Sequence, residues 1–165
     1  MQLTGQLAKQ FREVHVGGNW TASNLKDTVT GINWQQATTR VHSFNTIAAL
    51  VYHMNYYVSA VIKVLQGEPL DAHDKYSFDH PPILDAGDWE QLLSKTWSDA
   101  ENFATLVEKL PDDKLWENMA DEKYGTYFRN INGIIQHNHY HTGQVALIRK
   151  LVLEADEQNK PTQQL

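Results

Sequence analysis

Four long segments of this chain repeat apolar residues at the three- and four-residue spacing of an amphipathic helix. They cover residues 3–16, 43–65, 88–110 and 126–152, and glycine or proline follows each of the first three. Residues 21–30 and 34–37 add shorter helical patterns. Because four such helices must bury their apolar faces against each other, the sequence predicts an all-α fold, a four-helix bundle.

The connection between the second and third helices, residues 67–87, is unusually long, because bundle loops normally span about 2–8 residues. A stretch of this length can reach about 70 Å, whereas a 20-residue helix is about 30 Å long. The connection can therefore cross the whole bundle. We expect it to make the second and third helices parallel.

Length and composition restrict the function. The 165 residues fit one domain, with a polar tail from about residue 155. The 14 basic and 20 acidic residues give a net charge of −6 without a basic cluster, so we expect no nucleic-acid partner. The N-terminal residues lack the apolar core of a signal peptide, and no run of 18 apolar residues occurs. These features predict a cytoplasmic protein with no membrane partner.

The chain has no cysteine, which leaves histidines and carboxylates as metal ligands. His137 and His141 are four residues apart in the last helix and lie within about 40° of each other on its surface, so both rings can reach one ion. His53 lies on the flank of the apolar face of the second helix. If these helices meet there, the three imidazoles form a metal site; otherwise they are packing residues with satisfied hydrogen bonds.

A three-histidine site has open coordination positions, which favours a catalytic or substrate-binding role over a structural one. Nitrogen ligands suit both zinc and nickel. A bound divalent ion can lower the pKa of its water from about 15.7 to about 7, or bind a thiolate. We expect metal binding to weaken below about pH 6, where free imidazole becomes protonated.

Several other polar residues are explained by solvent exposure or by structural hydrogen bonds. His139 projects more than about 150° from both His137 and His141, which predicts a solvent-side position. Asn138 and Gln144 are candidates either to orient a ligand histidine or to form a structural hydrogen bond. The remaining histidines lie near helix ends or in loops and are expected to be solvated: His15, His42, His73 and His80.

The chain resembles the DinB-like proteins, of the damage-inducible superfamily that includes bacillithiol S-transferases. The resemblance is strongest in HMNYYV at residues 53–58 and in QHNHYHTGQVALIRK at residues 136–150. It is weaker in NWTASNLKDTV at residues 19–29 and DKYSFDHPPI at residues 74–83. The H-x-x-x-H-x-G-Q pattern at residues 137–144 is the most specific element of the resemblance.

The resemblance implies an up-down-down-up bundle, a divalent ion such as zinc or nickel held by His53, His137 and His141, and a homodimer. It also implies a small-molecule substrate and, in some relatives, a low-molecular-weight thiol. We can assign no general base from it. Two functions stay open: a metal-dependent S-transferase or hydrolase, and a metal-dependent binding or stress-response protein without turnover.

Overall fold

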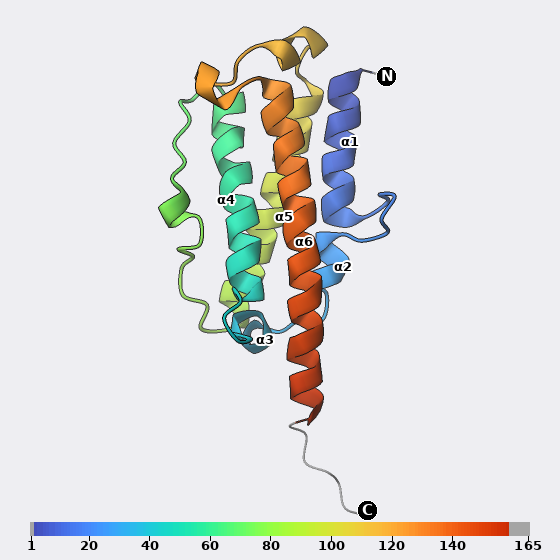
Figure 1. Ribbon diagram of the computed structural model, residues 1–165, viewed down its shortest axis with the longest axis vertical. Helices are drawn as coiled ribbons and strands as arrows, with labels where there is room; N and C mark the ends of the chain where they lie inside the picture. The colour runs from blue at the N-terminus through green and yellow to red at the C-terminus, as the bar shows by residue number, and fades with distance from the viewer. Residues whose placement is uncertain (1, 159–165) are drawn as a thin grey trace, which may run out of the picture.

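The computed structural model describes residues 2–158, and over this range the chain is all-α, as predicted. The four long helices are α1 (Leu3–Val16), α4 (Ile47–Leu65), α5 (Ala86–Glu108) and α6 (Tyr127–Gln158). Figure 1 shows that α1 and α6 run in one direction and α4 and α5 in the other. The second and third long helices are therefore parallel, as the length of their connection predicted.

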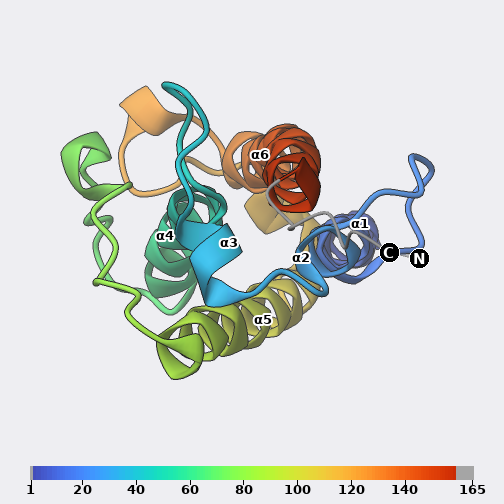
Figure 2. The ribbon, with the colours of Figure 1, turned by 90° about the horizontal axis from the view of Figure 1, so that it is seen from below.

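Each long helix packs against two others. α4 contacts α5 and α6, and α1 contacts the same two helices from the other side, so the four form a closed ring in cross-section (Figure 2). The short helices α2 (Leu25–Val29) and α3 (Trp34–Thr38) lie at the end of the bundle where α1 stops. α2 contacts α6, and α3 contacts α4, α5 and α6, so they close that end.

Side-chain caps set where α4 and α5 begin, and both starts differ from the prediction. α5 starts at Ala86 because Asp85 accepts a hydrogen bond from Asp88 N–H at 3.0 Å, while the Asp88 carboxylate accepts one from Leu84 N–H at 2.8 Å. α4 starts at Ile47 because the Thr46 hydroxyl accepts from Ala49 N–H at 3.1 Å. Both starts lie within four residues of the predicted ones.

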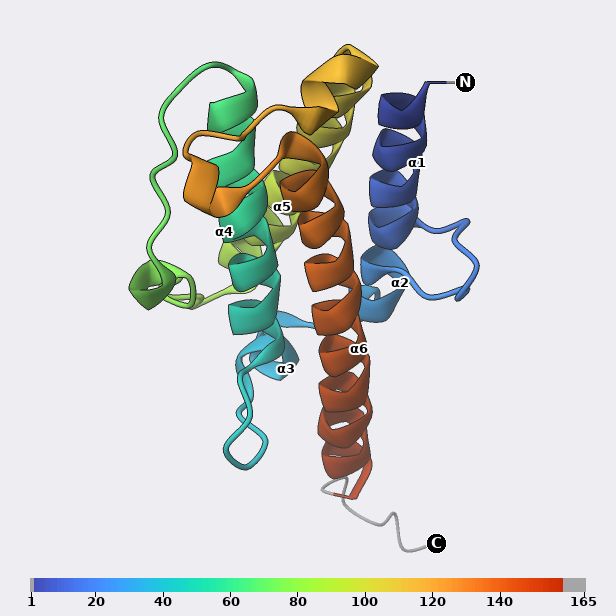
Figure 3. The same cartoon turned by 45° about the horizontal axis from the view of Figure 1, so that its top comes forward.

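The segment between α4 and α5 descends along the outside of α4 and carries a single 3₁₀ turn, η1 (Asp74–Tyr76) (Figure 3). The hydroxyl of Tyr56 accepts from His73 N–H at 2.8 Å and donates to the His73 carbonyl at 3.2 Å. The hydroxyl of Tyr57 donates to the Asp74 carboxylate at 2.6 Å. Two adjacent tyrosines of α4 thus fasten this segment, which we call the strap (residues 66–85), to the bundle.

The segment between α5 and α6 contains η2 (Asp112–Trp116) and η3 (Glu122–Tyr124) and crosses the opposite end of the bundle (Figure 3). The interior forms two apolar clusters along the bundle axis. One is built around Phe11, Phe103 and Ile131, the other around Ile47, Trp89 and Ile148. Between them α6 changes from apolar to polar residues, and this polar layer holds the predicted histidines.

α4 is long and apolar enough, by length and composition alone, to cross a membrane. In this fold 67% of that stretch is buried among the other helices. Packing against α5 and α6 accounts for its apolar character. At the other end of the chain, α6 continues to Gln158, past residue 155 where the polar tail was expected to begin, and residues 159–165 lie outside the described range.

Candidate metal centre

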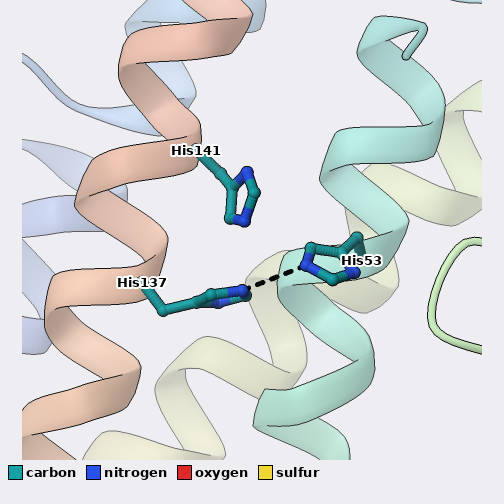
Figure 4. A group of neighbouring side chains, drawn as sticks. All are labelled: His53, His137 and His141. Atoms are coloured by element: carbon teal, nitrogen blue, oxygen red, sulfur yellow. Dashed lines mark hydrogen bonds between the residues drawn. The ribbon is translucent and has the colours of Figure 1, made fainter. Parts of the chain in front are cut away.

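The structure brings the three predicted histidines together. His53 projects from α4, and His137 and His141 project from α6 across the gap between the helices (Figure 4). One ring nitrogen of each lies within 4.8 Å of the other two. Nε2 of His53 is 3.1 Å from Nε2 of His137. These three imidazoles are close enough to bind a single metal ion.

The spacing of the nitrogens fits an ion that is shared by all three rings. Two nitrogens bound to one tetrahedral ion at about 2.0–2.1 Å are about 3.3 Å apart. The 3.1 Å separation of the His53 and His137 Nε2 atoms is close to that value. A nitrogen of His141 lies within 4.8 Å of a nitrogen of each of the other two rings.

Buried nitrogens in the cluster also lack partners. Nδ1 of His53 and Nδ1 of His137 are buried and have no hydrogen-bond partner of good geometry within residues 2–158. The two facing Nε2 atoms can form a hydrogen bond only if one of them carries a proton. A metal ion bound to the facing Nε2 atoms would take the place of that proton, whereas the two Nδ1 atoms would keep their present surroundings.

Gln144 orients His141. Nδ1–H of His141 donates to Oε1 of Gln144 at 2.6 Å, and Nε2 of Gln144 donates to the hydroxyl of Tyr140 at 3.1 Å. With the proton held on Nδ1, the lone pair of His141 is on Nε2, the nitrogen free for a ligand bond. Of the two roles expected for Gln144, the structure shows the one that orients a histidine.

Aromatic rings cover His53. Phe78 of the strap stacks on it with ring centroids 3.9 Å apart and planes 8° from parallel. Tyr57 meets both His53 and His137 edge-on, with its ring centroid 5.2 Å from each. The hydrogen bond from Tyr57 to Asp74 couples this ring to the strap. The strap is therefore part of the site as well as a connection.

Burial keeps the cluster neutral. It is the main cause that lowers the pKa of His53 to about 4, and the nearby His137 and His141 act in the same direction. The backbone of Ser77 and the carboxylate of Asp74 oppose this shift. Burial also lowers the pKa of His137 and that of His141. Neutral imidazole is the form that binds metal, so the site is ready for an ion at neutral pH.

A cavity of about 410 Å³ adjoins the cluster between α4, α6, the strap and the crossing segment. His53 and His137 form part of its wall, as does Tyr57. Apolar side chains line much of the rest, including Val61, Leu70, Met119 and Ile134. A small molecule in this space would lie against two of the three histidines.

One prediction about a histidine is wrong. His15 was expected to be solvated, but only 2% of it is exposed. Its Nδ1–H donates to the Phe11 carbonyl at 3.0 Å, and its Nε2 accepts from Asn138 at 3.3 Å. Asn138 therefore links α6 to α1, the structural alternative expected for it. The signal was present in the sequence, because His15 follows Phe11 by four residues on the apolar face of α1.

The other histidines lie outside the cluster. His139 is half-buried and its Nε2 lies 3.0 Å from the hydroxyl of Thr21, away from the three rings. His42 and His73 are exposed, as predicted. His80 is half-buried beside Tyr52, with ring centroids 6.0 Å apart. None of the four belongs to the group that could share an ion among the described residues.

Comparisons of the chain with models of protein families, with curated proteins and with solved structures find no match. The geometry of the site therefore carries the functional argument.

Proposed function

We propose that the chain is a DinB-like protein in which His53, His137 and His141 hold one divalent ion, and that it acts on a small molecule as a metal-dependent thiol S-transferase or hydrolase. One observation carries this proposal: three imidazoles from two helices converge within 4.8 Å beside a cavity. Three protein ligands leave a coordination position open, which is typical of catalytic zinc sites.

Nitrogen ligands suit zinc and nickel alike. When bound, such an ion supplies a Lewis acid that lowers the pKa of a coordinated thiol or water. The surrounding residues prepare the ligands. Gln144 presents the unprotonated Nε2 of His141, burial keeps the imidazoles neutral, and Phe78 covers one face of His53.

A second candidate is a metal-dependent binding or stress-response protein without turnover. The observation that favours it is the lack of a free carboxylate in the described part of the cavity wall. Asp74 is the one carboxylate there, and it already accepts a hydrogen bond from Tyr57. A reaction that needs a separate general base would have none in place.

Turnover assays separate the two candidates. Zinc- or nickel-loaded protein is incubated with low-molecular-weight thiols and electrophiles such as chlorodinitrobenzene or fosfomycin, beside His53→Ala and the control His139→Ala. The enzyme proposal expects wild type and His139→Ala to exceed His53→Ala. Equal rates for all three across the panel would remove the enzyme proposal, and tight binding by calorimetry without product would favour the second candidate.

A further inference from the structure

A positively charged residue, Arg129, lines the cavity beside the histidines. Arg129, Gly133 and His137 all line it, and because they are spaced by four residues they follow one face of α6. His53 and Val61 of α4 lie in the same wall. The cavity volume, about 410 Å³, falls in the range typical of small-molecule sites. Arg129 and the two histidines thus line one space, and Arg129 is exposed to solvent.

Arg129 has no ion-pair partner among residues 2–158. Arg12, in contrast, is paired with both Glu101 and Glu108. The stem of Arg129 lies against Gly125, where an added Cβ would approach Cδ of Arg129 to 2.9 Å. Glycine at residue 125 therefore lets Arg129 lie close against the chain at the entrance to α6.

The carboxylate of the cavity does not neutralise Arg129. Asp74 is hydrogen-bonded to Tyr57 at 2.6 Å and forms no ion pair with Arg129 among residues 2–158. Gly133, between Arg129 and His137, borders open space, since a Cβ there would meet nothing within 4 Å. Apolar side chains, Leu70 and Ile134 among them, line much of the rest of the cavity.

We propose that this cavity binds a small organic anion. Arg129 takes its carboxylate or phosphonate group, the apolar wall takes its body, and its other end faces His53 and His137. Arginine forms paired, charge-assisted hydrogen bonds with such groups, which makes it the natural anchor. Such an anion would be the substrate class of the proposed metal enzyme. Binding of its charged group to Arg129 does not depend on that function, whereas the placement of its other end beside a metal ion at the histidines rests on it.

Calorimetry on the full chain tests the anion site with three probes of similar shape: phenylacetate, phenylphosphonate and uncharged phenylacetamide. Each is titrated into metal-free and zinc-loaded protein. The variants are Arg129→Gln, which removes the charge, and Gly133→Leu, which fills the cavity. Arg40→Gln removes an exposed charge outside the cavity wall and serves as control. Metal content and melting temperature are measured on every variant, to show that the fold and the histidines are intact.

We expect both anions to bind metal-free wild type about ten-fold or more tightly than the amide. Arg129→Gln should abolish that preference, Gly133→Leu should abolish binding of all three probes, and Arg40→Gln should change nothing. Equal affinity for anion and amide in wild type, no binding of any probe, or unchanged preference in Arg129→Gln would overturn the inference. Arg129-dependent binding by a protein that takes up no metal would instead refute the proposed metal function and leave the anion site standing.

Discussion

Oε1 of Gln144 accepts a 2.6 Å hydrogen bond from Nδ1 of His141, one turn earlier on the same helix. This contact places the lone pair of His141 on Nε2 before any ligand arrives. Partners of this kind commonly strengthen metal binding because they fix both the tautomer and the orientation of the ring.

Replacing Gln144 should weaken the metal site without unfolding the bundle. We expect Gln144→Leu to lower zinc affinity by about 10- to 100-fold. The free energy of unfolding of the metal-free protein should fall by about 1–2 kcal/mol, because the half-buried hydrogen bond to His141 and the exposed one to Tyr140 are both lost. Competition titration with a zinc chelator measures the affinity. Gln136→Leu, at an exposed position on α6, is the control. Unchanged affinity in Gln144→Leu would show that His141 is held by packing alone.

His15 makes the metal-free protein sensitive to acid. Burial lowers its pKa to about 4 from about 6.5 in the unfolded chain, where it is free to take up a proton. The unfolded state therefore gains protons first, and stability falls as the pH drops from about 6.5 to about 4. The contribution of His15 to this loss is about 3 kcal/mol.

Urea unfolding of wild type and His15→Gln at pH 7 and pH 4, with chelator present, checks this expectation. Wild type should lose about 3 kcal/mol more than His15→Gln over this range. His42→Gln, at an exposed position, should behave like wild type. Equal losses in wild type and His15→Gln would mean that His15 does not titrate as a buried histidine.

Tyr56 should hold the strap against α4. Tyr56→Phe removes both hydrogen bonds to His73, and we expect the His73 amide to exchange its hydrogen about five-fold faster, since one net hydrogen bond stabilises by about 1 kcal/mol. Hydrogen exchange followed by mass spectrometry measures the change. Tyr52→Phe is the control, because the Tyr52 hydroxyl has no hydrogen-bond partner in the described part of the chain. Equal exchange in both variants would mean that contacts other than the Tyr56 hydrogen bonds hold the strap against α4.

The sequence predicted the all-α fold, the parallel second and third long helices, and the meeting of His53 with His137 and His141. The fold class and the helix faces on which the histidines lie follow from helical periodicity. The parallel direction follows from the length of the connection, and the resemblance to DinB-like proteins implied that His53 joins the other two histidines. The placement of Phe78 over His53 could not be predicted, because the strap has no periodicity and its path depends on contacts with Tyr56 and Tyr57.

Two other features were missed for different reasons. His15 was judged by its nearness to the end of α1, but α2 and α6 cover that end, and burial follows from tertiary packing. Arg129 was not considered because a single arginine carries little information in a sequence. Its position eight residues before His137, with Gly133 between them, was the available signal.

The central claim, that three imidazoles share one ion, is tested most directly by metal analysis. Wild type is compared with His53→Ala, His137→Ala, His141→Ala and the control His139→Ala after equilibration with zinc or nickel and removal of free ion. We expect one ion per chain in wild type and His139→Ala, a higher melting temperature when the ion is bound, and loss of both in each of the other three variants. A wild-type chain that retains no ion and melts at the same temperature with and without added metal would contradict the account.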